Sequence, residues 1–416
     1  MITKLEAWCY KSLKHFSISP SNVNLIIGAN GTGKTNFVDL IDFISAALRL
    51  GLKEAFDKQG GIDEVRTKPP GSGRRPALAC EISLGPDPNR GIKEATYYFR
   101  VAASKSLEVE EERLEAIVLA RSPGRRSLQE LVKYSKTTEV RIKFSRKKEK
   151  ITEWSSLLGE NPKSADDPQN LILNIYGKLG HFRNISDYLS SMRVYNIDGP
   201  IAKISSDLTD NELERSGANM ISFLKKVLED DHLRSQLLDD LRNAVPYIKN
   251  IVPQRILTYT TLRFEEADSK LDFTAQQMSD GTIRLLGMLA ILRQSVPPTI
   301  AVIEEPENAI HSHAVKVFCQ IAQEVSNSPK LSTQIFLTSH SPTVVDSILS
   351  LDSQLDTSTK CFVAKRKKGV ATIEQVSEKV MRAIARNLGR PSDFLREGSF
   401  GDTPSQLEIE FDTNES

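Results

Sequence analysis

The chain has 416 residues, of which 39% are hydrophobic and 26% are charged, as is ordinary for a folded water-soluble protein. Its formal net charge is +1, so the overall charge predicts neither a nucleic-acid partner nor an acidic one, and any such preference has to be local. The N-terminus lacks the continuous apolar segment of a signal peptide, and no apolar run is long enough to cross a bilayer, so we expect a cytoplasmic protein with no membrane partner.

The N-terminal part of the chain predicts strands on either side of one helix. Residues 2–12 alternate between apolar and polar side chains, which favours an edge strand. The apolar run 23–28 predicts a buried strand, and the amphipathic segment 36–51 predicts a helix that Gly51 ends. Further along, the composition predicts a glycine- and proline-rich loop at 60–75 and strands at 77–85 and 95–103.

The texture changes between about 105 and 190, where charged and apolar residues alternate in short runs. This pattern favours small antiparallel strands, followed by helices around 165–192. Residues 121–150 hold eleven lysines and arginines against three glutamates, a local net charge of +8. This span could bind nucleic-acid phosphates, or it could be the solvated face of a small sheet, and the residues alone leave both readings open.

The rest of the chain alternates between helices and strands. Leucines and other apolar residues recur at helical spacing over 212–243, and strand-like segments return from 251. Continuous apolar strands separated by helices then predict a parallel sheet that is covered on both faces. The expected elements are strands at 299–305 and 333–341, helices at 313–328 and 341–351, a hairpin at 360–376, and an acidic, disordered tail at 401–416.

The four cysteines are Cys9, Cys80, Cys319 and Cys361, which are scattered and include no CxxC pair. Cys319 and Cys361 lie in apolar runs and are expected to be buried thiols. This usage fits a reducing compartment.

A phosphate-binding loop is the strongest motif in the sequence. Residues Gly28 to Thr35 read GANGTGKT and match G-x-x-x-x-G-K-[ST] in full, between a predicted strand and a predicted helix. Glycines let the backbone wrap a polyphosphate, and the free N–H groups of the helix start attract anions. Lys34 is expected to neutralise phosphate oxygens, and Thr35 to offer its hydroxyl to Mg²⁺.

Two glutamates end the strand predicted at 299–305. At the carboxyl edge of a parallel sheet, ligands usually bind. Successive strand residues point in opposite directions, so Glu304 and Glu305 should have different roles. We assign Glu304 to the metal and Glu305 to the water that it orients or deprotonates. The simpler alternative is a solvated acidic turn.

Histidines follow in the same region. His340 ends the next strand and could reach a terminal phosphate from that edge, although a strand-end histidine at the surface is an equally simple reading. His311 and His313 lie early in the helix after Glu307 and are expected to be at the surface.

A second polar motif, Ser279-Asp280-Gly281, begins a helix that is apolar almost all round. A serine at this position caps many helices. The same geometry also leaves N–H groups free to bind a phosphate. The residues alone do not separate these two roles.

The order of these motifs resembles the ABC-type ATPases, in particular the non-transporter branch with SMC-like and RecF-like heads. The resemblance is strongest to the prokaryotic "predicted ABC-type ATPases", AAA-family ATPases of the kind found in anti-phage defence pairs. It covers most of residues 1–375 and includes the phrases GGIDEVRT, MRVYNIDGP, SGANMISFL and EEPENAIH.

The resemblance implies an α/β fold: a P-loop NTPase with an ABC-type head, a mixed sheet flanked by helices, an antiparallel β lobe and an inserted β/α subdomain. It implies ATP and Mg²⁺ as cofactors. The implied site comprises the Walker A residues Gly28, Asn30, Gly31, Gly33, Lys34, Thr35 and Asn36, the signature residues Ser279, Asp280 and Gly281, the metal ligands Thr35 and Glu304, the catalytic Glu305, and the switch histidine His340.

The sequence departs from the family pattern at several points. The signature reads MSDGT rather than LSGGQ, and the Walker B acid is glutamate rather than aspartate. Asn308 to His311 occupy the place of the D-loop aspartate, and no secure Q-loop glutamine is found.

The resemblance also suggests a division of the chain. Residues 1–104 and 251–400 would form the two halves of the ATPase head, residues 105–250 an inserted strand and helix subdomain, and residues 401–416 the tail.

Two functions of different classes follow. In the first, two copies pack head to tail and sandwich ATP between the phosphate loop of one and Ser279–Gly281 of the other. They hydrolyse the ATP slowly and thereby switch a partner effector in anti-phage defence or DNA maintenance. In the second, the protein is a DNA-binding scaffold in which ATP is a structural ligand. The insertion at 105–250 argues against a transporter ATPase. The chain has no evident nuclease motif, so we expect any nucleic-acid cleavage to need a partner nuclease or toxin.

Overall fold

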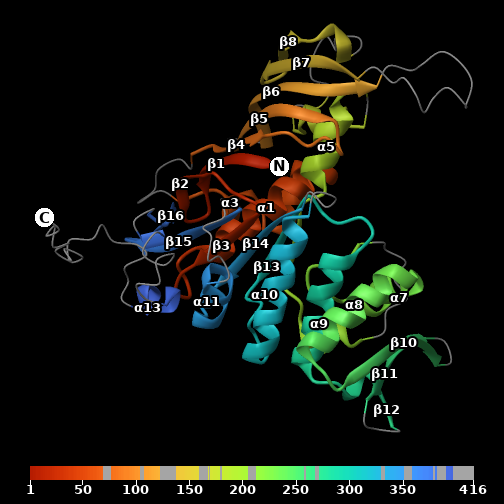
Figure 1. Ribbon diagram of the computed structural model, residues 1–416. Helices are drawn as coiled ribbons and strands as arrows, with labels where there is room; N and C mark the ends of the chain where they lie inside the picture. The colour runs from red at the N-terminus through yellow and green to blue at the C-terminus, as the bar shows by residue number, and fades with distance from the viewer. Residues whose placement is uncertain are drawn as a thin grey trace, which may run out of the picture.

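The protein folds around one long mixed β-sheet with helices on both faces, beside a helical lobe that carries a small antiparallel sheet (Figure 1). This architecture is that of the computed structural model. It describes residues 1–68, 76–103, 107–121, 137–158, 167, 169–178, 180–204, 212–256, 259–267, 271–328, 333–350, 358–377, 380–381 and 390–396.

Within these residues the large sheet has thirteen strands, in the order β8-β7-β6-β5-β4-β1-β2-β16-β15-β3-β14-β13-β9. Their bounds are β1 Ile2–Tyr10, β2 Leu13–Ile18, β3 Val23–Ile27, β4 Leu78–Leu84, β5 Ile92–Ala103, β6 Leu107–Arg121, β7 Thr137–Lys147, β8 Lys150–Trp154, β9 Arg193–Tyr195, β13 Ile300–Glu304, β14 Gln334–Ser339, β15 Thr359–Lys367 and β16 Val370–Gln375. The small sheet consists of β10 Ile248–Ile256, β11 Tyr259–Glu266 and β12 Asp272–Thr274.

The helices are α1 Lys34–Arg49, α2 Leu52–Lys58, α3 Ile62–Val65, α4 Ile172–Ile175, α5 Phe182–Ser190, α6 Gly199–Ala202, α7 Met220–Glu229, α8 Asp231–Ala244, α9 Asp280–Arg293, α10 Ser312–Ser326, α11 Pro342–Ser350 and α13 Pro391–Arg396. Two short 3₁₀ turns are η1 Ser156–Leu158 and η2 Ala275–Gln277. The helices that were predicted at 36–51, 313–328 and 341–351 correspond to α1, α10 and α11 and are confirmed.

The parallel part of the sheet is buried on both faces, as its continuous apolar strands predict. Strands β15, β3, β14, β13 and β9 run parallel, and every residue of β3, β13 and β14 is buried. Alternate residues of β3 enter different cores: Leu25 joins the core beneath α9, α10 and α11, and Ile26 joins the core beneath α1. Because these strands run in the same direction, the loops at their carboxyl ends lie on one edge of the sheet.

The antiparallel part corrects two predictions. Residues 2–10 do not form an edge strand, because β1 pairs with β2 on one side and with β4 on the other. An alternating pattern shows which face of a strand is buried but not how many neighbours the strand has. The strands after 105 are antiparallel, as predicted, but only β8, with five residues, is small. Strand β6 has 15 residues and pairs along its length with β5 and β7.

Consequently the segments on either side of residue 104 share one sheet, since β5 and β6 are neighbours in it. Of the basic span 121–150, residues 122–136 lie outside the described part of the chain. The tail at 401–416 lies outside it as well.

The helical lobe is built around α9. Its residues 282–292 are all buried, which explains why the sequence is apolar almost all round. Helices α7, α8 and α10 pack against it, and β10–β12 extend from the same lobe (Figure 1). Of the segment 212–243 that was predicted to be helical, residues 212–219 are turns and irregular structure, and helix begins only with α7. The helical part is divided at Asp230, whose carboxylate caps α8.

All four cysteines are free thiols, and Cys80, Cys319 and Cys361 are buried, as expected for the last two. Among the described residues, no helix is both long and apolar enough to span a membrane.

Candidate functional site

The carboxyl ends of four parallel strands meet at one edge of the sheet and bring together residues that are distant in sequence. In the pairing register, Ile27 at the end of β3 lies opposite Ser339 of β14, and Thr338 lies opposite Glu304 of β13. The phosphate loop, His340 and the two glutamates therefore follow neighbouring strands. Strand β9 ends at the same edge, which adds Asn196 to the set.

The phosphate loop keeps the free amides that its sequence predicts. Gly33 caps α1 in a left-handed conformation, with φ 111°, and contributes no side-chain hydrogen bond, so the first N–H groups of α1 remain available to an anion. The β15–β16 hairpin packs closely on the loop. A Cβ on Gly28 would lie 2.6 Å from the Ala364 carbonyl oxygen, and one on Gly33 would lie 2.6 Å from Ala371 Cβ. Larger residues at these two glycines would push the hairpin away.

Lys34 points back into the loop. Its Nζ donates hydrogen bonds to the carbonyl oxygens of Gly28, at 2.6 Å, and Ala29, at 3.1 Å. Burial lowers the pKa of Lys34, and the carboxylates of Glu305 and Glu307 oppose that shift. The ammonium group thus lies in the concavity of the loop and faces the acidic strand ends.

The remaining loop residues have separate environments. Asn30, Gly31 and Thr35 are exposed. Asn36, which was predicted as a cofactor-binding residue, donates from Nδ2 to Ser12 Oγ at 2.6 Å and so ties α1 to the β1–β2 turn.

Glu304 is a buried carboxylate that is paired with an arginine. Its side chain is 9% exposed, and its Oε1 lies 2.6 Å from Arg215 Nη2. The other guanidinium nitrogen of Arg215 lies 3.2 Å from Asp39 Oδ1 on α1. Burial raises the pKa of Glu304, while the positive charge of Arg215 opposes that rise. Arg215 was missed in the sequence, because no local pattern connects it to a strand end many residues away.

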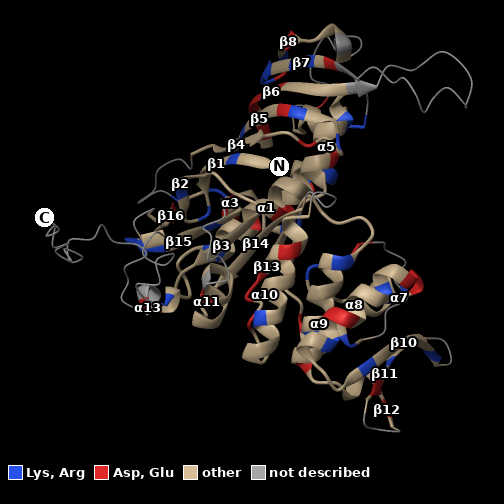
Figure 2. Ribbon diagram, viewed as in Figure 1, with Lys and Arg blue, Asp and Glu red and all other residues tan. Residues whose placement is uncertain are grey.

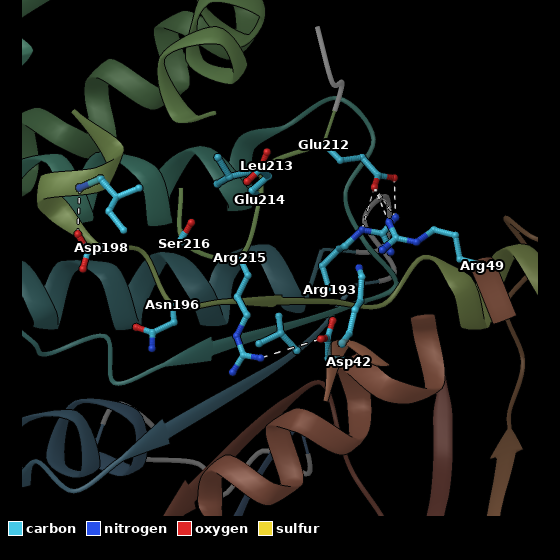
Figure 3. Close-up of a pocket in the computed structure, with 13 residues that line it drawn as sticks. Asp42, Arg49, Arg193, Asn196, Asp198, Glu212, Leu213, Glu214, Arg215 and Ser216 are labelled. Atoms are coloured by element: carbon cyan, nitrogen blue, oxygen red, sulfur yellow. Dashed lines mark hydrogen bonds and ion pairs between the residues drawn. The ribbon is translucent and has the colours of Figure 1, made fainter. Parts of the chain in front are cut away.

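Arg215 also lines a pocket of about 930 Å³ between α1, β9 and the segment 212–216. Figure 3 shows Arg215 extending across this pocket toward Asp42, with Arg49 and Arg193 on the far side near Glu212. Arg193 Nη2 lies 2.5 Å from Glu212 Oε2, so these two opposite charges in the lining of the pocket neutralise each other.

Glu305 leaves the strand in a left-handed backbone conformation, with φ 44°. Such a conformation costs a non-glycine residue on the order of 1–3 kcal/mol and often occurs at functional sites. The turn places Glu305 Oε1 3.5 Å from His340 Nδ1, while Asn308 Nδ2 donates to Glu305 Oε2 at 2.7 Å. Glu304 and Glu305 therefore have different surroundings, as the alternation along a strand predicts.

Glu307 holds the end of β14 in place. Its Oε1 accepts hydrogen bonds from Ser339 Oγ, at 2.7 Å, and from the His340 backbone N–H, at 3.3 Å. It also lies 3.6 Å from His340 Nδ1, so the imidazole faces two carboxylates. The sequence shows Glu307 only as a third acidic residue after the strand, and its contact with β14 is visible only in the fold.

Ser279 does cap α9, and it is also exposed. Its Oγ accepts a hydrogen bond from the Thr282 backbone N–H at 3.1 Å. Asp280 is exposed too and lies 2.5 Å from Lys203 Nζ. Gly281 packs so tightly that a Cβ would collide with the Ala309 carbonyl oxygen. The helix start is accessible to a second molecule while it contacts the turn after Glu305.

Arg284, one and a half turns further along α9, was also missed. It is 7% exposed and lies among apolar neighbours. Its Nη2 donates to the carbonyl oxygens of Glu304, at 2.8 Å, and Glu305, at 3.0 Å. A charged residue within the apolar run from Ile283 to Leu292 is the sequence signal that could have identified it, since a buried guanidinium needs buried acceptors.

His311 and His313 are exposed, as predicted. His311 caps α10, with its Nδ1 accepting from the His313 backbone N–H at 3.3 Å, and His313 Nε2 lies 3.1 Å from the Asn243 carbonyl oxygen. Of the described residues, no three His, Cys, Asp or Glu cluster as a metal site built by protein alone.

Thr35 and Glu304 fit a magnesium ion that takes its other ligands from phosphate and water. Mg²⁺ prefers oxygen ligands and is often held by one or two protein oxygens together with substrate phosphates. A hydroxyl at the exposed start of α1 and a carboxylate at the end of β13 are donors of this kind.

Some of the cations in the described part of the basic span pair with carboxylates of β6 and β8. Arg146 and Glu112 are both fully buried, with Nε and Oε2 3.0 Å apart. Lys143 Nζ lies 2.8 Å from Glu115 Oε1 and 3.2 Å from Glu153 Oε2. Figure 2 shows acidic and basic residues mixed along β5, β6 and β7 rather than a uniformly basic face. The local count of +8 omits these cross-strand partners.

Comparison with solved structures gives the fold independently. A crystal structure of the SMC head bound to the C-winged helix domain of ScpA matches with a TM-score of 0.54 and 15% identity, over 92% of this chain and 99% of that chain. The SMC head domains of Pyrococcus furiosus and Pyrococcus yayanosii each match with a TM-score of 0.50 and 13% identity, over 93% and 96% of this chain and 99% of theirs. At this identity the likeness establishes an SMC-head fold.

No curated protein matches the chain. A family model does match, from residue 23 to residue 346, which is well over half of the sequence and includes every motif described above. The chain therefore belongs to the family described as "AAA domain, putative AbiEii toxin, Type IV TA system", and it is an ABC-type, SMC-like ATPase by fold.

Proposed function

We propose that the protein binds ATP with Mg²⁺ at Gly28–Thr35, hydrolyses it slowly, and uses ATP-driven pairing of two copies as a switch. The observation that carries this proposal is the geometry of Glu305. It lies 3.5 Å from His340 at the sheet edge that also bears the phosphate loop, and it is 30% exposed, so water can reach it.

Each residue has a part that its surroundings support. The amides of the α1 start and Lys34 hold phosphate oxygens, and Thr35 with Glu304 holds the metal, which supplies further charge neutralisation when it is bound. Glu305 orients the attacking water and takes up its proton, and His340 contacts the terminal phosphate. The Asn308 amide holds the Glu305 carboxylate at the turn, while Arg215 pairs with Glu304.

The second half of the site comes from another copy. Ser279 and Asp280 are exposed at the N-terminus of a 14-residue helix, where amides and the helix dipole favour an anion. We therefore place Ser279–Gly281 against the nucleotide of the partner subunit, which makes a head-to-tail dimer that ATP stabilises and hydrolysis opens.

The output of the switch is proposed to be a partner effector, a nuclease or toxin, in anti-phage defence or DNA maintenance. The family description refers to a toxin system, and two of the similar SMC heads were solved bound to a ScpA domain. These names support a role in a multiprotein system. The gene neighbourhood of this chain is the direct source for the partner's identity.

Glu305→Gln tests the hydrolytic role, with Lys34→Ala as the matched variant for binding. We expect Glu305→Gln to bind ATP and to lose turnover by roughly 10²- to 10⁴-fold, the usual contribution of a general base. Lys34→Ala should lose ATP binding itself. Turnover by Glu305→Gln at the wild-type rate would contradict the assignment.

The alternative, a DNA-binding scaffold in which ATP is a structural ligand, has less support. The carboxylates of β6 neutralise Lys143 and Arg146, which were part of its basic surface. It would be favoured instead if Glu305→Gln stopped turnover while the biological output continued, or if DNA affinity fell steeply with salt.

A further inference from the structure

Arg284 is a buried charge within the apolar part of α9, from Ile283 to Leu292. Of its neighbours on α9, residues 282–292 are all buried, and Arg284 itself is 7% exposed. A buried guanidinium is costly unless acceptors surround it, so its contacts indicate why it is there.

All the acceptors of Arg284 lie at two strand ends of the candidate site. Nη2 donates to the Glu304 carbonyl oxygen at 2.8 Å and to the Glu305 carbonyl oxygen at 3.0 Å, at the end of β13. Nη1 donates to the Ile197 carbonyl oxygen, and Nη2 lies 3.4 Å from Asn196 Oδ1, both after β9. The guanidinium therefore fixes the ends of β9 and β13 to α9.

The contact with Glu305 supports a strained turn. Glu305 has φ 44°, and its carbonyl oxygen accepts hydrogen bonds from Arg284 and from the Asn308 backbone N–H, at 3.0 Å. The Glu305 N–H also donates to the Thr338 carbonyl oxygen at 2.9 Å. Without the guanidinium, one of the hydrogen bonds that hold this turn is lost, and we expect the carboxylate to be held less firmly beside His340.

The start of α9 is fixed to the same turn. A Cβ on Gly281 would collide with the Ala309 carbonyl oxygen, and Ala309 also has a left-handed backbone, with φ 61°. A shift of the Ser279–Gly281 start would therefore displace the turn at residues 305–309 by direct backbone contact. Arg284 lies five residues after Ser279 on the same helix and would move with it.

We infer that Arg284 is a positioning residue that links Glu305 to α9 of the same subunit. Through this link, the geometry of Glu305 depends on whether that α9 contacts the nucleotide bound to the partner subunit. This inference rests on the proposed function, because it needs the head-to-tail dimer. It predicts that the two sites of a dimer are coupled, so that each site hydrolyses efficiently only when both nucleotides are bound.

The test compares Arg284→Gln and Arg284→Lys with Arg293→Gln. Arg293 lies on the same helix and its Nε is 2.6 Å from Asp240 Oδ2, so its loss removes an ion pair of α9 that is remote from Glu305. We expect Arg284→Gln to bind a fluorescent ATP analogue and to associate with ATP as the wild type does. Its kcat should fall by about 10- to 100-fold, the scale of a misplaced catalytic group, with KM unchanged and a Hill coefficient near 1.

Arg284→Lys keeps a positive donor, so it should recover part of the kcat, and Arg293→Gln should keep the wild-type kcat and Hill coefficient. Equal loss in Arg284→Gln and Arg293→Gln would overturn the inference, because it would indicate a merely structural role. If Arg284→Gln does not fold, Arg284→Lys decides by the same measurements.

Hydrogen exchange gives a readout that does not depend on turnover. The amide of Asn308 donates to the Glu305 carbonyl oxygen, so a peptide that includes 304–310 reports the turn directly. We expect faster exchange there in nucleotide-free Arg284→Gln. ATP should slow exchange in the wild type but neither in Arg284→Gln nor in Ser279→Arg, which is expected to bind ATP without associating.

These outcomes separate the two levels of the account. If Ser279→Arg still associates and turns over, the proposed dimer itself is wrong. If Ser279→Arg blocks association while Arg284→Gln keeps the wild-type kcat and exchange pattern, the dimer stands and the inference about Arg284 is wrong.

Discussion

Replacing Arg146 with methionine should strongly destabilise the antiparallel end of the large sheet. Arg146 on β7 and Glu112 on β6 are each 0% exposed, and their Nε and Oε2 atoms are 3.0 Å apart. Glu112 also accepts hydrogen bonds from the hydroxyl of Tyr97, at 2.8 Å, and from the backbone N–H of Ile172, at 2.7 Å. The substitution leaves this carboxylate buried without its counter-charge.

The expected cost is about 3–5 kcal/mol, the usual effect of removing one partner of a buried ion pair. At about 2.1 cal/mol/K of unfolding entropy per residue, the midpoint of a chain of 416 residues falls by roughly 1 °C per kcal/mol, which gives a decrease of roughly 3–6 °C. The loss should also depend on pH. Burial raises the pKa of Glu112, and Arg146 opposes that rise, so the variant has a still higher pKa.

A carboxyl group with a raised pKa in the folded state binds a proton more readily when folded than when unfolded. Its contribution to stability is therefore complete below the unfolded pKa and is lost as the pH rises through the folded pKa. We accordingly expect Arg146→Met to be less destabilised at pH 5 than at pH 8.

The assay is urea denaturation followed by tryptophan fluorescence at both pH values. Trp154 is a local reporter, since its ring packs 6.2 Å from that of Phe144 on β7. Lys143→Met is the matched control, because Lys143 is on the same strand but its ion pairs are exposed, and exposed pairs contribute about 0–1 kcal/mol. A loss in Arg146→Met no larger than in the control, or one that grows toward acid pH, would refute this reasoning.

Two further predictions concern packing. Gly281→Ala should lower the free energy of unfolding by about 1–3 kcal/mol in thermal denaturation, since its Cβ meets the Ala309 carbonyl oxygen. On the same helix, a Cβ on Gly287 comes within 3 Å only of the flexible side chain of Met220, with Ile197 at ordinary contact distance, so Gly287→Ala should be neutral or stabilising. The reverse order would contradict the packing of α9. In the native protein, N-ethylmaleimide should modify Cys9 well before the three buried cysteines, because complete burial raises the thiol pKa of those three. Mass spectrometry measures the order of labelling, and uniform labelling of all four would contradict this burial.

The sequence reveals those parts of the site that are local. The phosphate loop, the glutamates after β13 and the Ser279 cap are each signalled by a few adjacent residues and by the strand or helix beside them. The parallel sheet was predictable for the same reason, because its buried strands are continuous apolar runs. The positions of these motifs at one edge follow from the parallel order of the strands.

The parts that the sequence does not reveal depend on long-range pairing. Arg215 reaches Glu304 from a separate segment of the chain, and Arg284 acts on carbonyl groups, which leave no trace in side-chain patterns. The local count of +8 could not include Glu112 and Glu115, which pair with Arg146 and Lys143, because these glutamates lie on another strand. The number of neighbours of β1 could not be read from its alternation either.

The central claim is that Ser279–Gly281 acts on the nucleotide of another copy, and mass photometry tests it most directly. Using Glu305→Gln, which should keep ATP bound, we expect ATP to shift the mass from that of one chain to that of two. Adding Ser279→Arg should abolish this shift while a fluorescent ATP analogue still binds through Lys34. The account is contradicted if the protein turns over ATP as a strict monomer, or if Ser279→Arg loses ATP binding and association together.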